Sequence, residues 1–156
     1  MKSALAALVV AAALCPATAF AYADPAVQAK AFIEAFDKGD AKAAAETMLP
    51  AGVAITDEVP PYLWQGPTAF ADWARDLQAN DKAAGIAHES VALADATRRE
   101  MSAGIAYVIA PATYSFTLNG KTMSETAQMT FVMKYTDAGW KIAAFTWTGP
   151  AASPAR

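Results

Sequence analysis

Cysteine and histidine are almost absent from this sequence. Cys15 and His88 are the only examples among its 156 residues. A usual zinc site needs about four ligands, mostly Cys and His, and the sequence has no H-E-x-x-H pair. It also has neither a G-x-S-x-G turn nor a phosphate-binding glycine loop. We therefore expect no metal, no cofactor and no cysteine or serine nucleophile.

Charged residues are sparse and slightly more acidic than basic. They make up 17% of the sequence and include no long basic run. Lys2 is the only charged residue before Asp24, so residues 24–156 carry 11 basic and 15 acidic side chains, a net charge of −4. Nucleic-acid-binding domains and proteins that bind anionic membranes carry basic clusters instead. We expect neither kind of partner for the domain.

The first 23 residues follow the pattern of a secretory signal peptide. Lys2 precedes a short apolar run at 4–14, and two A-x-A cleavage sites end at Ala21 and Ala23. The run is too short to span a bilayer, which takes about 20 apolar residues. We predict a signal peptide at 1–23, one domain at 24–150 and a disordered tail at 151–156. The protein is then periplasmic or secreted; an uncleaved anchor is the alternative.

The first half of the domain is predicted to be mostly helical. Asp24 and Pro25 are typical of a helix start, and Gly39 is typical of a helix end. A second helix is predicted at 41–49 after Asp40, and a third after Pro67, where apolar residues recur with helical spacing. Between the second and third helices, 53–57 alternates as a strand does, and 62–64 reads as a short extended piece.

The second half is predicted to be an antiparallel sheet. Alternating residues indicate strands at 86–96, 101–118, 122–136 and 139–148, with turns at 119–120 and 138–139. The strands are long, which suits a strongly bent sheet, and Pro111 indicates a bulge or bend. Arg98, Arg99 and Glu100 read as a solvated turn between strands.

The strand at 122–136 has two different faces. One face is apolar from Met123 to Tyr135 apart from Glu125, whereas the other is rich in threonine. We expect the apolar face to cover the helices. The threonine-rich face points outward, to solvent or to a second copy of the chain in a homodimer.

The order of these elements resembles the NTF2-like superfamily, and within it the SnoaL-like proteins. The resemblance covers nearly all of the domain and is carried by F-D-K-G-D at 36–40, W-Q-G-P at 64–67, Y-V-I at 107–109 and G-W-K-I at 139–142. It implies an α+β cone, with three N-terminal helices packed in a strongly bent antiparallel sheet and a pocket at the open end. Isomerases, dehydratases, cyclases and pure binding modules share this fold, so the resemblance leaves the function open.

Two carboxylates are the candidate catalytic residues. Asp57 shares a strand face with Val53 and Ile55, and the resemblance to ketosteroid isomerases puts a base carboxylate at nearly this position. An apolar cavity raises the pKa of a carboxyl group, which can then exchange protons near neutral pH. Asp57 is otherwise a solvated turn residue. Glu125 lies on an apolar face, either lining the pocket opposite Asp57 or reaching water at the end of its strand.

The other parts of the isomerase site are missing. The resemblance aligns Phe32 with a tyrosine and Met129 with a protonated aspartate, and neither residue here can donate a hydrogen bond to an enolate. Steroid isomerisation by that route is therefore not expected.

Five further residues are candidates for ligand binding. Tyr62 and Trp64 lie beside a Pro-Pro pair near the presumed open end, and Trp73 lies on the third helix. Tyr107 is a candidate to supply a hydroxyl group, and His88 is a rim candidate. Aromatic rings also fill cores between sheets and helices, which is the plainer explanation for most of them.

Three functions fit the sequence. The first is an exported domain that binds a small hydrophobic or aromatic molecule in the pocket of its cone. The second is a cofactor-free proton-transfer enzyme, an isomerase, cyclase or dehydratase, with Asp57 as general base. The third is a structural or partner-binding domain whose cavity is filled by Met129, Met133 and Phe131.

Overall fold

The computed structural model describes residues 23–155. The predicted signal peptide therefore lies outside the described residues, except for Ala23. The described chain forms three helices, α1 (Ala26–Asp37), α2 (Ala41–Glu46) and α3 (Ala69–Ala84). None of the helices in this part of the chain is long and apolar enough to cross a membrane.

Eight strands form one sheet. They are β1 (Val53–Thr56), β2 (Leu63–Gly66), β3 (Ile86–Leu93), β4 (Arg98–Ser102), β5 (Ile105–Leu118), β6 (Lys121–Thr136), β7 (Gly139–Thr148) and β8 (Ser153–Pro154). The order is β2-β1-β7-β6-β5-β3, with β4 beside β5 and β8 beside β6. All pairs are antiparallel except β1 with β7, which is parallel. The predicted α+β class and element order are confirmed, but the sheet is mixed.

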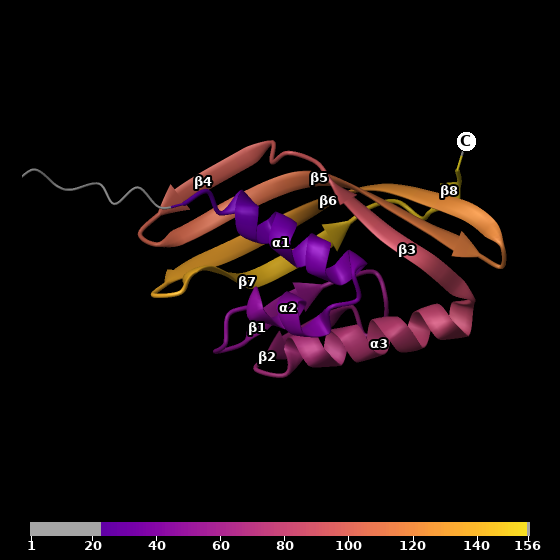
Figure 1. The fold of residues 1–156 in the computed structure, drawn as a ribbon, viewed down its shortest axis with the longest axis horizontal. Helices are drawn as coiled ribbons and strands as arrows, with labels where there is room; N and C mark the ends of the chain where they lie inside the picture. The colour runs from indigo at the N-terminus through magenta and orange to yellow at the C-terminus, as the bar shows by residue number, and fades with distance from the viewer. Residues whose placement is uncertain (1–22, 156) are drawn as a thin grey trace, which may run out of the picture.

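The long strands β5 and β6 bend over the helices (Figure 1). α1 and α2 lie under this arch, and α3 runs along the side formed by β1 and β2. From the end of α3, β3 crosses back to the edge of β5. The helices therefore pack against the inner face of a strongly bent sheet, which is the arrangement expected for the cone.

The predicted starts of the first two helices are correct. The Asp24 carboxylate accepts a 2.9 Å hydrogen bond from the backbone N–H of Ala26, and the Asp40 carboxylate does the same for Ala43. Both acids therefore satisfy backbone donors that a helix start leaves open. α2 ends at Glu46 rather than at residue 49, because Met48 bridges to Ile142 of β7 and the Leu49 N–H donates to the Ile142 carbonyl.

The predicted strand at 101–118 is two strands. A turn at Ala103 and Gly104, both with positive φ (48° and 76°), separates β4 from β5. The predicted turn at 98–100 was therefore wrong, since these residues pair with β5 and are exposed strand residues. In the sequence, Gly104 was the residue that could have indicated a turn between two strands here.

Pro111 causes no bulge between β5 and β6, whose register is continuous through it. Its carbonyl accepts the Ala94 N–H at the place where β5 changes partner from β3 to β4. In an antiparallel sheet, the backbone N and carbonyl of one residue face the same neighbouring strand. The side of Pro111 that lacks an N–H therefore faces the place where β5 changes partner from β3 to β4.

The core lies between the apolar face of β6 and the helices. Inward residues of β6 from Glu125 to Met133 are buried at every second position, as predicted. Within the tail that was predicted to be disordered, Ser153 and Pro154 form β8 and pair with Ser124 and Met123 of β6. The backbone hydrogen bonds that this edge of β6 offers hold the segment in place.

Candidate functional site

A cavity of about 290 Å³ lies between α1, α3 and the inner face of the sheet. Its wall is mainly apolar and aromatic, with a group of acidic side chains. The apolar and aromatic lining includes Phe32, Ile33, Phe36, Val59, Trp73, Leu77, Ile86, Val91, Tyr114, Phe116, Met129, Phe145 and Trp147. The predicted apolar hollow with an acidic side chain is therefore present in the structure.

The aromatic part of the wall is continuous across helices and sheet. The ring centroid of Phe32 on α1 lies 5.2 Å from that of Phe145 on β7 and 6.3 Å from that of Trp73 on α3. Phe36 adds a further contact with Trp73 at 5.9 Å. Rings at these distances pack favourably and form a rigid surface. The two positions that align with hydrogen-bond donors of ketosteroid isomerases, Phe32 and Met129, are thus apolar parts of this wall.

Asp57 directly follows β1 and lines the cavity. The indole Nε1–H of Trp73 donates a 2.6 Å hydrogen bond to its Oδ2, and the Glu58 N–H donates a 2.7 Å bond to its Oδ1. Burial raises the pKa of the Asp57 carboxyl group, and these two hydrogen bonds, which favour the charged form, oppose the rise. The side chain is thus held in one orientation in a poorly solvated position.

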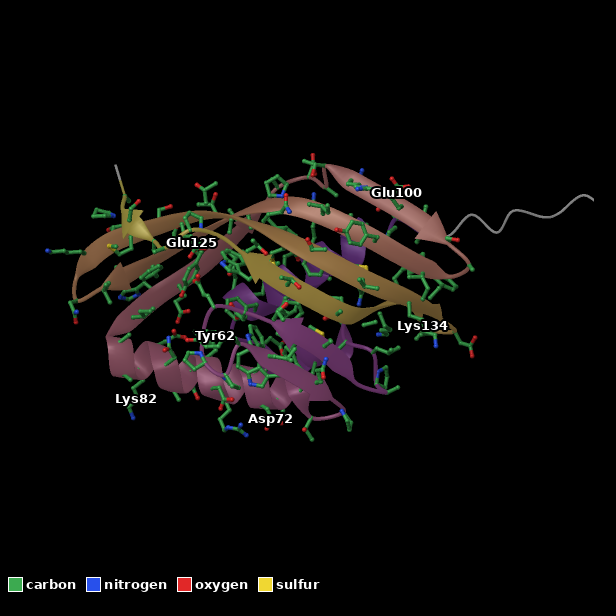
Figure 2. All side chains as sticks on the ribbon, turned by 180° about the vertical axis from the view of Figure 1, so that it is seen from behind. Tyr62, Asp72, Lys82, Glu100, Glu125 and Lys134 are labelled. Atoms are coloured by element: carbon green, nitrogen blue, oxygen red, sulfur yellow. The ribbon has the colours of Figure 1, made fainter. Side chains whose placement is uncertain are left out.

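Glu125 lines the cavity from β6 and is 2% exposed. Its Oε1 accepts a 2.8 Å hydrogen bond from the indole Nε1–H of Trp147 on β7. Gly149 lies directly against the same carboxyl group, and a Cβ atom at this position would overlap Glu125 Oε1. Glu125 is therefore enclosed by the sheet and by the chain that follows β7. In Figure 2, it lies toward the β8 end of the sheet, far from Lys134 at the other end.

Glu58 and Glu125 form an acid pair. Burial and, after it, the charge of Glu125 raise the pKa of Glu58 to about 7. Glu58 is exposed at the outer side of the site. The pair can therefore hold and exchange a proton near neutral pH at the cavity mouth.

A second pair of acids lies on the α3 and β3 side of the cavity. Glu89 Oε2 accepts a 2.6 Å hydrogen bond from the Tyr114 hydroxyl group. Burial raises the pKa of Tyr114, so the phenol remains a donor at ordinary pH. Asp81, which is 7% exposed, has a pKa raised to about 6, first by burial and then by the charge of Glu89.

Three of the seven predicted site residues meet in the cavity wall, namely Asp57, Glu125 and Trp73. Tyr62 is 58% exposed outside it, although it follows Asp57 closely in the chain. Trp64 is buried, but its Nε1–H donates to Asp76 on the outer part of α3. Neither residue is part of the cavity lining, because the turn after β1 carries them past its mouth.

The structure also places Tyr107 and His88 away from the cavity. Inward positions of β5 are Ala106, Val108 and the following even-numbered residues, so Tyr107 faces outward, under the guanidinium group of Arg98. His88 is exposed and has a φ of 54°, within the irregular stretch of β3 between Ala87 and Ser90. The prediction of a pocket hydroxyl from Tyr107 was wrong; Tyr114, on the inward face of the same strand, occupies such a position.

Acid–base chemistry and the binding of apolar molecules are what this arrangement allows. Among residues 23–155, no three His, Cys, Asp or Glu side chains are grouped as metal ligands would be. The carboxyl groups instead spread over the cavity wall, each with an aromatic or acidic neighbour.

Comparison with known proteins identifies the family of this fold. A model of the SnoaL-like domain family matches residues 28–145. No curated protein matches the chain in sequence.

Three solved structures illustrate the likeness. A hexachlorocyclohexane dehydrochlorinase, LinA-type3 from Novosphingobium barchaimii, has a TM-score of 0.68 and 16% identity, over 82% of this chain and 85% of that one. An NTF2-like superfamily protein from Salmonella enterica has a TM-score of 0.65 and 15% identity, over 80% and 87%. A ketosteroid isomerase-like protein from Erwinia carotovora has a TM-score of 0.61 and 16% identity, over 81% and 93%. At these identities the likeness concerns the fold. Because the family model covers most of the chain, the protein belongs to the SnoaL-like domain family.

Proposed function

We propose that this domain binds a small hydrophobic or aromatic molecule in the cavity of its cone. The observation that carries the proposal is the cavity of about 290 Å³ with its aromatic wall. Close-packed protein interiors contain few voids larger than a water molecule, and ligand pockets are typically apolar with a few placed polar groups. A filled structural core, the third function considered from the sequence, would leave no such space.

A substitution that fills the cavity tests this proposal. Val91 on β3 lines the cavity and is 9% exposed, whereas Val27 on α1 is 65% exposed and outside it. tert-Butylbenzene is a suitable neutral aromatic probe, and its binding can be followed by ligand-observed NMR. We expect Val91→Phe to weaken binding at least about tenfold, which is about 1.4 kcal/mol. The matched Val27→Phe should leave binding unchanged; equal effects, or no binding to the unsubstituted protein, would contradict the proposal.

Proton transfer by Asp57 is the second candidate function. Its supporting observation is the Asp57 carboxyl group, oriented by Trp73 at 2.6 Å and with its pKa raised by burial. An ionised carboxylate in this setting is a stronger base than one in water, and the Glu58–Glu125 pair could receive the proton. One solved relative is a dehydrochlorinase, a type of reaction that removes a proton and a chloride ion.

This candidate is tested by hydrogen exchange on a simple carbon acid. 2-Indanone is aromatic and has exchangeable hydrogens beside its carbonyl group, so its deuteration in D2O can be followed by NMR. Protein-catalysed exchange that is lost in Asp57→Asn, but kept in Asp95→Asn, supports the base role. Asp95 is the matched control because its side chain is 88% exposed. Exchange at the buffer rate in both variants and in the unsubstituted protein would argue against it for this class of carbon acid.

Export to the periplasm or the medium is also part of our proposal. It rests on the Lys2 and A-x-A pattern of residues 1–23. A homodimer through the outer face of β5 and β6 remains a prediction.

A further inference from the structure

Within the described chain, the residues of the cavity wall include five carboxyl groups and no basic side chain. They come from four separate parts of the fold: the loop after β1, α3, β3 and β6. The five residues are Asp57, Glu58, Asp81, Glu89 and Glu125. Since no lysine, arginine or histidine among residues 23–155 lines the cavity, this part of the chain supplies no cation to balance them there.

Asp81 shows most directly that the acidic side chains of the cavity have no positive charge beside them. It is only 7% exposed and lines the cavity from α3. Its one hydrogen bond comes from Asn80 Nδ2 to Oδ1 at 3.4 Å, which is longer than the usual 2.7–3.2 Å range. No other hydrogen bond or ion pair to this carboxyl group joins it to the described residues. A buried carboxylate with a single long hydrogen bond is poorly compensated for its lost hydration, so a positive group from outside the chain would stabilise it.

The neighbouring acids increase this cost. The charge of Glu89 raises the pKa of Asp81, as does the more distant charge of Asp57. At the mouth, burial and then the charge of Glu125 raise the pKa of Glu58. A bound positive charge would relieve repulsion in both pairs, because it favours the ionised form of every nearby carboxyl group.

The aromatic wall favours an organic cation over a metal ion. The rings of Trp73 and Tyr114 border the same space as Asp81 and Glu89. Aromatic faces attract ammonium groups that lie within about 6 Å of the ring centroid. By contrast, no three acidic residues of the described chain are grouped closely enough to ligate one metal ion.

We propose that the occupant of this cavity is an organic cation, in which a protonated amine or quaternary ammonium group is attached to a hydrophobic or aromatic body. The ammonium group lies beside Asp81 and Glu89, and the apolar body lies against Phe32, Phe36 and Trp73. This inference rests on the proposed binding function and adds the charge of the ligand to it.

Two probes of the same shape and different charge test the inference. Phenyltrimethylammonium and tert-butylbenzene differ chiefly in the positive charge. We expect the cation to bind at least about tenfold more tightly at pH 8, a difference of about 1.4 kcal/mol. If tert-butylbenzene binds and the cation binds no better, the binding function stands and the cation inference is overturned. If neither probe binds, both proposals fail.

Substitution of Asp81 locates the charge. Asp81→Asn keeps the side-chain shape and removes the charge, so it should weaken binding of phenyltrimethylammonium about tenfold and leave that of tert-butylbenzene unchanged. Glu89→Gln should act in the same direction. Asp95→Asn, which removes the same charge from a side chain that is 88% exposed, should change neither probe. Equal losses for both probes in Asp81→Asn would overturn the placement of the ammonium group.

Discussion

Trp147 and Glu125 are joined across two strands by a 2.8 Å hydrogen bond from the indole Nε1–H to a carboxyl group that is 2% exposed. Trp147 is in register with Met129, so its indole reaches along β6 past one inward position to Glu125. The inner face of the sheet thus supplies both the acid and its donor. This contact fixes Glu125 at the cavity, opposite the Asp57–Trp73 pair on the helical side.

The Trp147–Glu125 bond should contribute measurably to stability. Trp147→Phe keeps an aromatic ring but removes the donor of a buried carboxyl group, which should lower the free energy of unfolding by about 1.5–3 kcal/mol. Trp140→Phe is the matched control, because its Nε1–H donates at 2.6 Å to a neutral acceptor, the Ala23 carbonyl. Urea unfolding should show the larger loss for Trp147→Phe. Equal losses would mean that a hydrogen bond to the Glu125 carboxyl group stabilises the fold no more than one to a neutral carbonyl group.

Gly149 should tolerate no side chain while Glu125 is present. A Cβ atom at this position would overlap the Glu125 carboxyl group and approach the Ala127 Cβ to 2.9 Å. Gly149→Ala should therefore destabilise the protein by about 1–3 kcal/mol, the usual cost of overpacking. Adding Glu125→Ala should recover part of this loss, because it removes the overlapping group. Thermal unfolding of the single and double variants would show whether the recovery occurs.

Stability should fall as the pH rises through the neutral range. The folded pKa of Glu58 is about 7 and its ordinary value is 4.5, so between these values the folded protein holds a proton that the unfolded chain has lost. Its stabilising contribution is therefore complete below about pH 4.5 and is lost by pH 8. Asp81, with a pKa of about 6, acts in the same direction.

Urea unfolding at pH 5 and pH 8 checks this dependence. Glu58→Gln should reduce the loss of stability between the two values, because the titrating group is gone. Asp95→Asn should not reduce it, since its partner Lys30 lowers the pKa of Asp95 and any titration falls below this range. An unchanged pH dependence in Glu58→Gln would show that the acid pair does not titrate there.

If the protein is exported, the structure favours a mature chain that begins at Tyr22, rather than at Asp24 as the predicted signal peptide at 1–23 implies. The Ala23 carbonyl accepts the Trp140 Nε1–H at 2.6 Å, so a cut after Ala21 keeps this contact and a cut after Ala23 removes it. The first A-x-A site, 19–21, is therefore favoured over the second. Intact-mass measurement of protein from the periplasm or the medium distinguishes the two. A mass that begins at Asp24 would contradict this preference, and a full-length mass would contradict export.

The positions of the main acids followed from the period of two along strands. Asp57 and Glu125 share strand faces with apolar residues, which made an inward position one of the two predicted for each; the other was a solvated turn for Asp57 and a strand end in water for Glu125. The same reasoning, applied to β5, would have placed Tyr107 outward and Tyr114 inward. Fold class and element order were predictable for a similar reason, because apolar periodicity is a local property of the sequence.

The remaining parts of the site depend on contacts that the sequence does not display. Glu89 faces the cavity only because the register of β3 shifts between Ala87 and Ser90. Trp147 and Glu125 are 22 residues apart, and the approach of Asp81 to Glu89 depends on how α3 crosses β3. Register shifts, sheet curvature and helix packing are set by the whole fold, so the five acids could not be grouped from the sequence.

The central claim is that a small apolar molecule occupies the space between Trp73 and Trp147. Four tryptophans in the chain give four indole N–H signals in a 15N NMR spectrum, and only these two line the cavity. On titration with tert-butylbenzene, we predict saturable shifts of the Trp73 and Trp147 signals, with those of Trp64 and Trp140 unchanged. Trp73 and Trp147 signals that stay in place at probe saturation, or shifts confined to Trp64 and Trp140, would contradict the claim.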